Sequence, residues 1–187
     1  MKNQGLYFRY NLIAFFSVFV ASLSMKYLSG FETEIAPYLY LPIGAKILIF
    51  LVFGKVVLPG VIASCLFCGY VLFDVWGGHM LWGAIGAIIG AMMPLLAMKV
   101  MEWLKIVDFS DLRKIDFRHV LFLIFFASIL HALSRFALYA KGEIFSSNPV
   151  DFIAHYLVGD MIGGIVVVWT ILKVLPGLIS FALARRT

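Results

Sequence analysis

The chain has 187 residues, of which 63% are hydrophobic and only 13% are charged, and its mean hydropathy is +1.02. Because a soluble domain carries roughly 25% charged residues, this composition excludes an ordinary soluble protein and predicts an integral membrane protein. The net charge of +5 does not indicate nucleic-acid binding, because no basic stripe with interleaved aromatic residues lies outside the apolar segments.

About six apolar stretches are long enough to cross a bilayer, which takes roughly 20 residues at about 1.5 Å rise per residue. They cover residues 10–28, 37–54, 56–74, 80–100, 119–139 and 152–175. We therefore expect one all-α membrane domain over residues 1–187, built as a bundle of transmembrane helices. The first stretch has no small-residue cleavage site, so we interpret it as a span and not as a signal peptide.

The second stretch carries a lysine, Lys46, near its middle. An ionisable group at that depth costs roughly 2.5–3.5 kcal/mol, so such groups are usually paired or functional. Gly54-Lys55 and Pro59-Gly60 then predict a tight helical hairpin into the third stretch. In the third stretch, Cys65 and Cys68 form a CxxC without a second ligand pair, which favours small apolar packing residues over a metal or redox site.

The fourth stretch has a face of small residues, Gly83, Gly86 and Gly90. Such a face lets helices approach closely, either within one bundle or in a homodimer or partner contact. Pro94 is predicted to kink this helix. The polar segment that follows, 103–118, mixes charges with apolar residues at rough helical spacing, which predicts a short amphipathic helix lying on the membrane surface between the fourth and fifth spans.

The last two stretches hold most of the remaining polar groups. In the fifth, His131 and Arg135 are four residues apart and therefore share a helix face. The sixth contains His155, and further on Asp160 at about the depth of Lys46. Two small residues flank that aspartate as a second GxxxG motif, Gly159 and Gly163, which has the same two interpretations as the first.

The basic residues predict the orientation. Most of them fall on one side of the predicted spans, and the positive-inside rule then places both termini in the cytoplasm. Aromatic residues are expected near the outer interface: Tyr38, Tyr40, Trp76, Trp82, Tyr139 and Tyr156.

Nearly all the intramembrane polar groups fall in the middle or the outer half of the bundle, and three interpretations follow. Lys46 and Asp160 could form a structural ion pair, with the other groups reaching the outer interface. Alternatively, a cavity open to the outside binds a small polar or anionic ligand through Lys46, His131, Arg135, His155 and Asp160. A metal site of His79, His131, His155 and Asp160 has suitable ligand types but no specific spacing, so we predict no metal and name no cofactor.

Three ordered motifs resemble MASE1, a bacterial integral membrane sensory domain. They are Ala36-Pro37 with Leu41-Pro42-Ile43-Gly44, then Gly54-Lys55-Val56-Val57-Leu58-Pro59-Gly60, then Tyr156-Leu157-Val158-Gly159-Asp160-Met161-Ile162-Gly163. The family's tryptophan before the proline is replaced by Tyr40, one position off, and the proline that often follows its G-D motif is absent. The resemblance implies a stand-alone, shortened sensory module in a bacterial inner membrane, whose output passes to a separate partner protein.

Three function classes follow. The first is a sensory or ligand-binding module that signals through a partner. The second is a transport subunit similar to the substrate-binding component of a vitamin transporter, and the third is a structural or assembly subunit of a larger membrane complex. We do not expect an enzyme, because no Ser/His/Asp or metal-ligand spacing stands out and the aqueous part of the chain is too small. Intramembrane hydrolysis by Asp160 would need a second membrane-centred carboxylate, and Asp74 is predicted at the outer rim.

Overall fold

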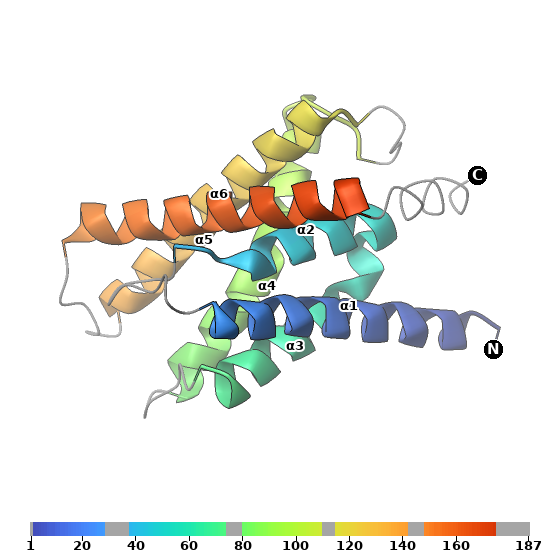
Figure 1. Cartoon of the computed structure of the whole chain (residues 1–187), viewed down its shortest axis with the longest axis horizontal. Coiled ribbons are helices and arrows are strands. Elements are labelled where there is room, and N and C mark those ends of the chain that lie inside the picture. The colour runs from blue at the N-terminus through green and yellow to red at the C-terminus, as the bar shows by residue number, and fades with distance from the viewer. Residues whose placement is uncertain (1, 29–37, 74–79, 110–114, 142–147, 175–187) are drawn as a thin grey trace.

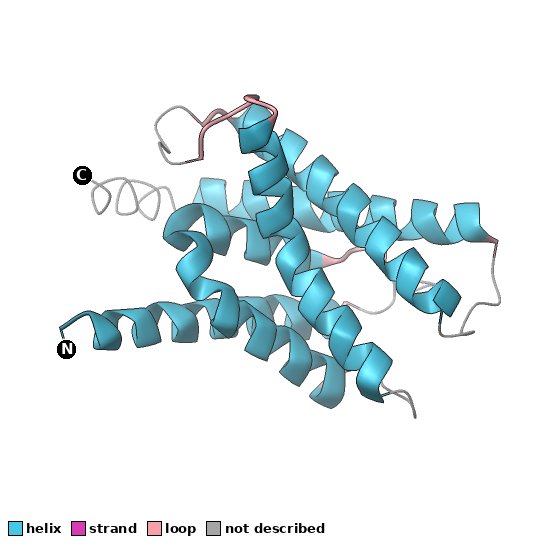
Figure 2. Ribbon diagram, turned by 180° about the vertical axis from the view of Figure 1, so that it is seen from behind, coloured by secondary structure: helices cyan, strands magenta, loops and turns pink. Residues whose placement is uncertain are grey.

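The structure is a computed structural model and describes residues 2–28, 38–73, 80–109, 115–141 and 148–174. Within these residues the chain is all-α (Figures 1 and 2). Its elements are α1 (Lys2–Tyr27), α2 (Leu41–Phe53), the 3-10 helix η2 (Gly54–Val57), α3 (Leu58–Val71), α4 (Met80–Trp103), α5 (Phe117–Lys141) and α6 (Pro149–Val174).

By length and hydropathy, five stretches of the described chain are candidate membrane spans, and not the six that the sequence predicted. The difference lies in the predicted spans 37–54 and 56–74, which correspond to the single stretch Leu41–Val71. η2 divides this stretch into α2, with 13 residues, and α3, with 14. Each half is only about 20 Å long, which is shorter than a hydrocarbon core of about 30 Å.

Local chemistry explains why α2 ends and α3 begins here. Gly54 has a φ of 69°, which favours glycine and stops α2. The N-terminus of α3 is capped from another helix: Asn11 of α1 accepts a hydrogen bond at Oδ1 from the Gly60 N–H, at 2.7 Å, and donates one to the Val56 carbonyl, at 3.2 Å. α2 and α3 do not pack against each other, so the predicted tight hairpin is wrong; the turn between them has a specific partner on α1 instead.

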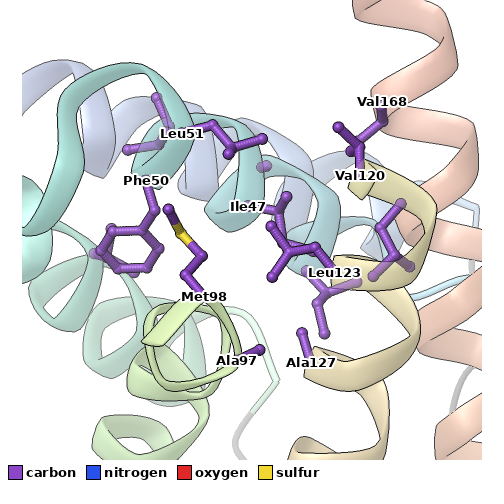
Figure 3. Close-up of a cluster of buried hydrophobic side chains, with 14 of the residues drawn as sticks. Ile47, Phe50, Leu51, Ala97, Met98, Val120, Leu123, Ala127 and Val168 are labelled. Carbon is purple, nitrogen blue, oxygen red and sulfur yellow. The ribbon is translucent and has the colours of Figure 1, made fainter. Parts of the chain in front are cut away.

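The short helix α2 lies at the centre of the bundle and packs against α1, α4, α5 and α6. Ten of its residues are buried, including Ile47 and Phe50 at 0% exposure. Figure 3 shows these side chains meeting Met98 of α4 and Leu123 of α5. An all-round apolar helix of this kind is typical of a core element, and Lys46 therefore enters the core together with its neighbours.

The outer surface of the bundle is rich in apolar side chains. Phe8, Leu81, Trp103 and Val150 are all at least 66% exposed. Exposed apolar surface of this extent is typical of a face that meets lipid. By helix length, hydropathy and exposure, the chain is a multi-pass membrane protein.

The segment after α4 differs from its prediction. Its described residues, 104–109 and 115–116, are turn and coil and not a surface helix; residues 110–114 lie outside the described chain. α4 stops because Lys105 takes a φ of 56° and Ile106 donates to the Met101 carbonyl at 3.0 Å, which is a Schellman cap. Phe109 is 3% exposed and joins the core, so the chain here folds inward.

Figure 1 shows the first turn of α1 and the last turn of α6 at the same end of the molecule. The placement of this end in the cytoplasm rests on the distribution of basic residues and stays a prediction.

Candidate functional site

A buried set of polar groups lies where α2, α4, α5 and α6 meet, and we call it the central polar network. It consists of the side chains of Lys46, His131, Arg135 and Asp160 together with the backbone carbonyl of Gly90. Lys46, His131 and Asp160 are each 1% exposed, and Arg135 is half-buried. The sequence predicted these four residues, together with His155, as one ligand-binding group, and the structure brings the four together.

Asp160 and His131 are hydrogen-bonded partners. Asp160 is eleven residues into α6 and His131 is fourteen residues into α5, so both lie near mid-helix. The distance from His131 Nδ1 to Asp160 Oδ2 is 2.6 Å. Because both side chains are shielded from solvent, this contact is far stronger than the same pair would be in water.

Arg135 completes a chain of three side chains. It is one turn after His131 on α5, and its Nε donates to His131 Nε2 at 3.3 Å. A guanidinium has no acceptor, so Nε2 must be the acceptor in this bond. The proton of a neutral His131 therefore lies on Nδ1, from which it is donated to Asp160.

Lys46 has a different partner from the one that the ion-pair interpretation assigned to it. Its Nζ donates to the carbonyl oxygen of Gly90 at 2.9 Å. Among the described residues no carboxylate lies at ion-pair distance from Lys46, and Asp160 contacts His131 instead. The predicted Lys46–Asp160 ion pair is therefore absent.

The identity of residue 94 explains why the Gly90 carbonyl is available. In an α-helix this carbonyl would accept from the N–H four residues later, and that residue is Pro94, which has none. α4 continues as one helix through Pro94. Lys46 satisfies the orphaned carbonyl from a neighbouring helix, which is how a proline is tolerated within an apolar environment.

Two tyrosines that were assigned to the outer aromatic belt in fact pack around His131. The ring centroids of Tyr40 and His131 are 5.5 Å apart, and Tyr156 meets His131 edge-on at 6.1 Å. The Tyr40 ring also lies 5.4 Å from Lys46 Nζ, a cation–π distance. The sequence carried no signal for these contacts, because Tyr40 precedes α2 and its position depends on how that segment crosses α6.

The predicted glycine faces explain how these groups fit. A Cβ on Gly86 would lie 2.7 Å from Arg135 Nη1, and one on Gly90 would lie 3.0 Å from His131 Nε2. The small residues of α4 therefore make room for the polar side chains of α5. Gly83 of the same predicted face is half-buried.

The second glycine motif holds the start of α2 against α6. The Tyr40 N–H donates to the Gly159 carbonyl at 3.0 Å, and a Cβ on Gly163 would lie 2.3 Å from the Tyr40 carbonyl carbon. Both glycine motifs thus make contacts within the chain. The homodimer interpretation stays a prediction.

His155 does not join the central polar network. Its Nε2 is 3.1 Å from the Tyr38 hydroxyl and its Nδ1 is 2.6 Å from the Asp151 carbonyl. His79, the other imidazole of the metal interpretation, lies outside the described residues. In the part of the chain that the structure describes, no three His, Cys, Asp or Glu side chains are grouped so as to hold a metal ion.

No protein-family model, curated protein or solved structure matches the chain.

Proposed function

We propose that the chain is a membrane-embedded sensory module in which the central polar network binds a small anion. The observation that carries the proposal is the burial of Lys46 at 1% exposure without a carboxylate partner among the described residues. A lysine ammonium in an apolar interior is costly unless its charge is balanced.

The charges of the network favour an anion over a cation. With Lys46 protonated, Lys46 and Arg135 are cationic, Asp160 is anionic, and His131 is neutral in the tautomer that its hydrogen bonds require. The network therefore has an excess of one positive charge. A small carboxylate or an inorganic monoanion would balance it, with Lys46 and Arg135 as its donors.

The contacts at the start of α2 support a signalling role. Tyr40 contacts Lys46 and His131 through its ring and Gly159 through its backbone. A ligand that moved Lys46 would therefore also disturb the crossing of α2 and α6. The MASE1-like motifs include this crossing, and on that resemblance the module reports to a separate partner protein at the cytoplasmic face of a bacterial inner membrane.

A purely structural role is the second candidate, and one observation favours it. Every buried side-chain nitrogen and oxygen of the described residues has a hydrogen-bond partner. A complete network of this kind rigidifies a core without any ligand. Under this interpretation Lys46 serves to satisfy the carbonyl that Pro94 leaves free.

The experiment is native mass spectrometry of the protein extracted in mild detergent from its own host. The proposal expects a bound small molecule that is lost in Lys46→Met and in Arg135→Met but retained in Lys55→Met. Lys55 is exposed at the turn after α2, so its variant makes the same chemical change outside the network. Folded protein with no added small mass in the unaltered chain would favour the structural role, and a stoichiometric protein partner would identify the output.

A further inference from the structure

The hydrogen bonds around His131 have fixed directions, and these directions specify which ring nitrogen carries the proton. Arg135 Nε must donate, so His131 Nε2 offers its lone pair to the guanidinium. His131 Nδ1 then holds the proton that points to Asp160 Oδ2 at 2.6 Å. Both ring nitrogens are therefore engaged while the imidazole is neutral.

We infer that His131 Nε2 is a proton-binding site that the Arg135 hydrogen bond blocks, and that uptake of a proton there breaks this bond and displaces the guanidinium from its place against α4. A proton from water would occupy the same lone pair that accepts the Arg135 hydrogen bond, so the two states exclude each other. The N–H bond to Nε2 forms, the Arg135–His131 hydrogen bond breaks, and the Asp160 contact becomes an ion pair of imidazolium and carboxylate. The inference does not depend on anion binding.

The charged and titratable groups that face His131 act in opposite directions. Asp160 of α6 favours the protonated ring, whereas Arg135 of α5 and Lys46 of α2 oppose it. Tyr40 and Tyr156 contribute neutral rings. From α4 the nearest group is Gly90, which has no side chain to titrate. Burial of the ring at 1% exposure also opposes the charged form, so one carboxylate acts against two cations and the apolar surroundings.

The release of Arg135 has a structural consequence at the α4–α5 contact. The Arg135 guanidinium already lies against Gly86 and Gly90, with Nη1 at 2.7 Å from a Cβ built on Gly86. Arg135 is half-buried, so a guanidinium repelled by a protonated imidazole must leave this position, either along α4 or towards the surface of the bundle. Proton uptake at His131 would thus change the packing of two long helices.

The test is 15N nuclear magnetic resonance of histidine-labelled protein in lipid nanodiscs, with His79, His119 and His155 replaced by glutamine so that His131 is the one labelled ring. At neutral pH we expect the Nδ1–H tautomer, and on acidification a doubly protonated ring. The Nε2–H tautomer, or a ring that does not titrate over the range in which the protein stays folded, would overturn the inference.

Arg135→Met provides the second measurement. Because it removes both the competing donor and a cation, the His131 titration midpoint should rise by roughly one pH unit or more. Arg118→Met makes the same change at an exposed arginine of α5 and should leave the midpoint in place. An equal titration midpoint in the two variants would refute the inference that Arg135 blocks protonation of His131 Nε2. The tautomer measurement retains Arg135 and decides the matter even if Arg135→Met does not fold.

Discussion

Replacing Lys46 by methionine removes the hydrogen bond to the Gly90 carbonyl, and the effect on stability should depend on residue 94. With Pro94 present, no helical N–H is available to that carbonyl, and the 2.9 Å bond from Lys46 Nζ satisfies it. In the Pro94→Ala background a new N–H at position 94 can take over. The two substitutions should therefore be strongly coupled, although they are on different helices.

The magnitude follows from the state of the carbonyl. A buried acceptor left without a partner costs about 1–3 kcal/mol, whereas one that exchanges partners costs little. The desolvation of the Lys46 ammonium is present in both backgrounds and cancels in the comparison. We therefore expect Lys46→Met to be about 1–3 kcal/mol more destabilising in the Pro94 protein than in the Pro94→Ala protein.

The assay is a double-mutant cycle on the free energy of unfolding, measured by reversible denaturation in mixed micelles with circular dichroism. Lys55→Met with Pro94→Ala is the matched cycle. It should be additive because Lys55 is exposed and takes no part in the hydrogen bond to the Gly90 carbonyl. Additivity of the Lys46 cycle to within about 0.5 kcal/mol would refute the reasoning, because it would mean that Lys46 and Pro94 share no partner.

Three further substitutions test backbone features of the fold by the same unfolding measurement. Gly60→Ala should destabilise the protein by about 1–3 kcal/mol, because its Cβ would lie 2.3 Å from a backbone oxygen of α1. Gly5→Ala is the control and should not destabilise, because nothing lies within 4 Å of its Cβ. Equal effects of the two substitutions would contradict the close approach of α3 to α1. Gly163→Ala should destabilise similarly, because its Cβ would meet the Tyr40 backbone, and an unchanged free energy would show that this crossing is loose. Lys105→Gly should stabilise by about 1 kcal/mol by relieving the left-handed conformation at φ 56°, and a loss of stability would argue against the Schellman cap.

Much of the site was visible in the sequence as single residues. Helix rise converts sequence position into depth in the bilayer. It predicted buried polar side chains at four positions, Lys46, His131, Arg135 and Asp160. Their partners were not predictable. Hydrogen bonds need contacts of about 3 Å, and these depend on the rotation and crossing of four helices, which no local pattern encodes.

The membrane class and the positions of the long helices were determined by the sequence itself, because hydropathy and helix length are local properties of the chain. The tertiary structure decided how the apolar stretch Leu41–Val71 is built: a turn at Gly54 that Asn11 stabilises divides it into α2 and α3, which are both short. It also decided that Asp160 pairs with His131, and that Lys46 donates a hydrogen bond to the Gly90 carbonyl, which Pro94 leaves without a helical partner. Both pairings arise between helices, where close packing at glycine faces, and not the order of residues, determines which polar groups meet.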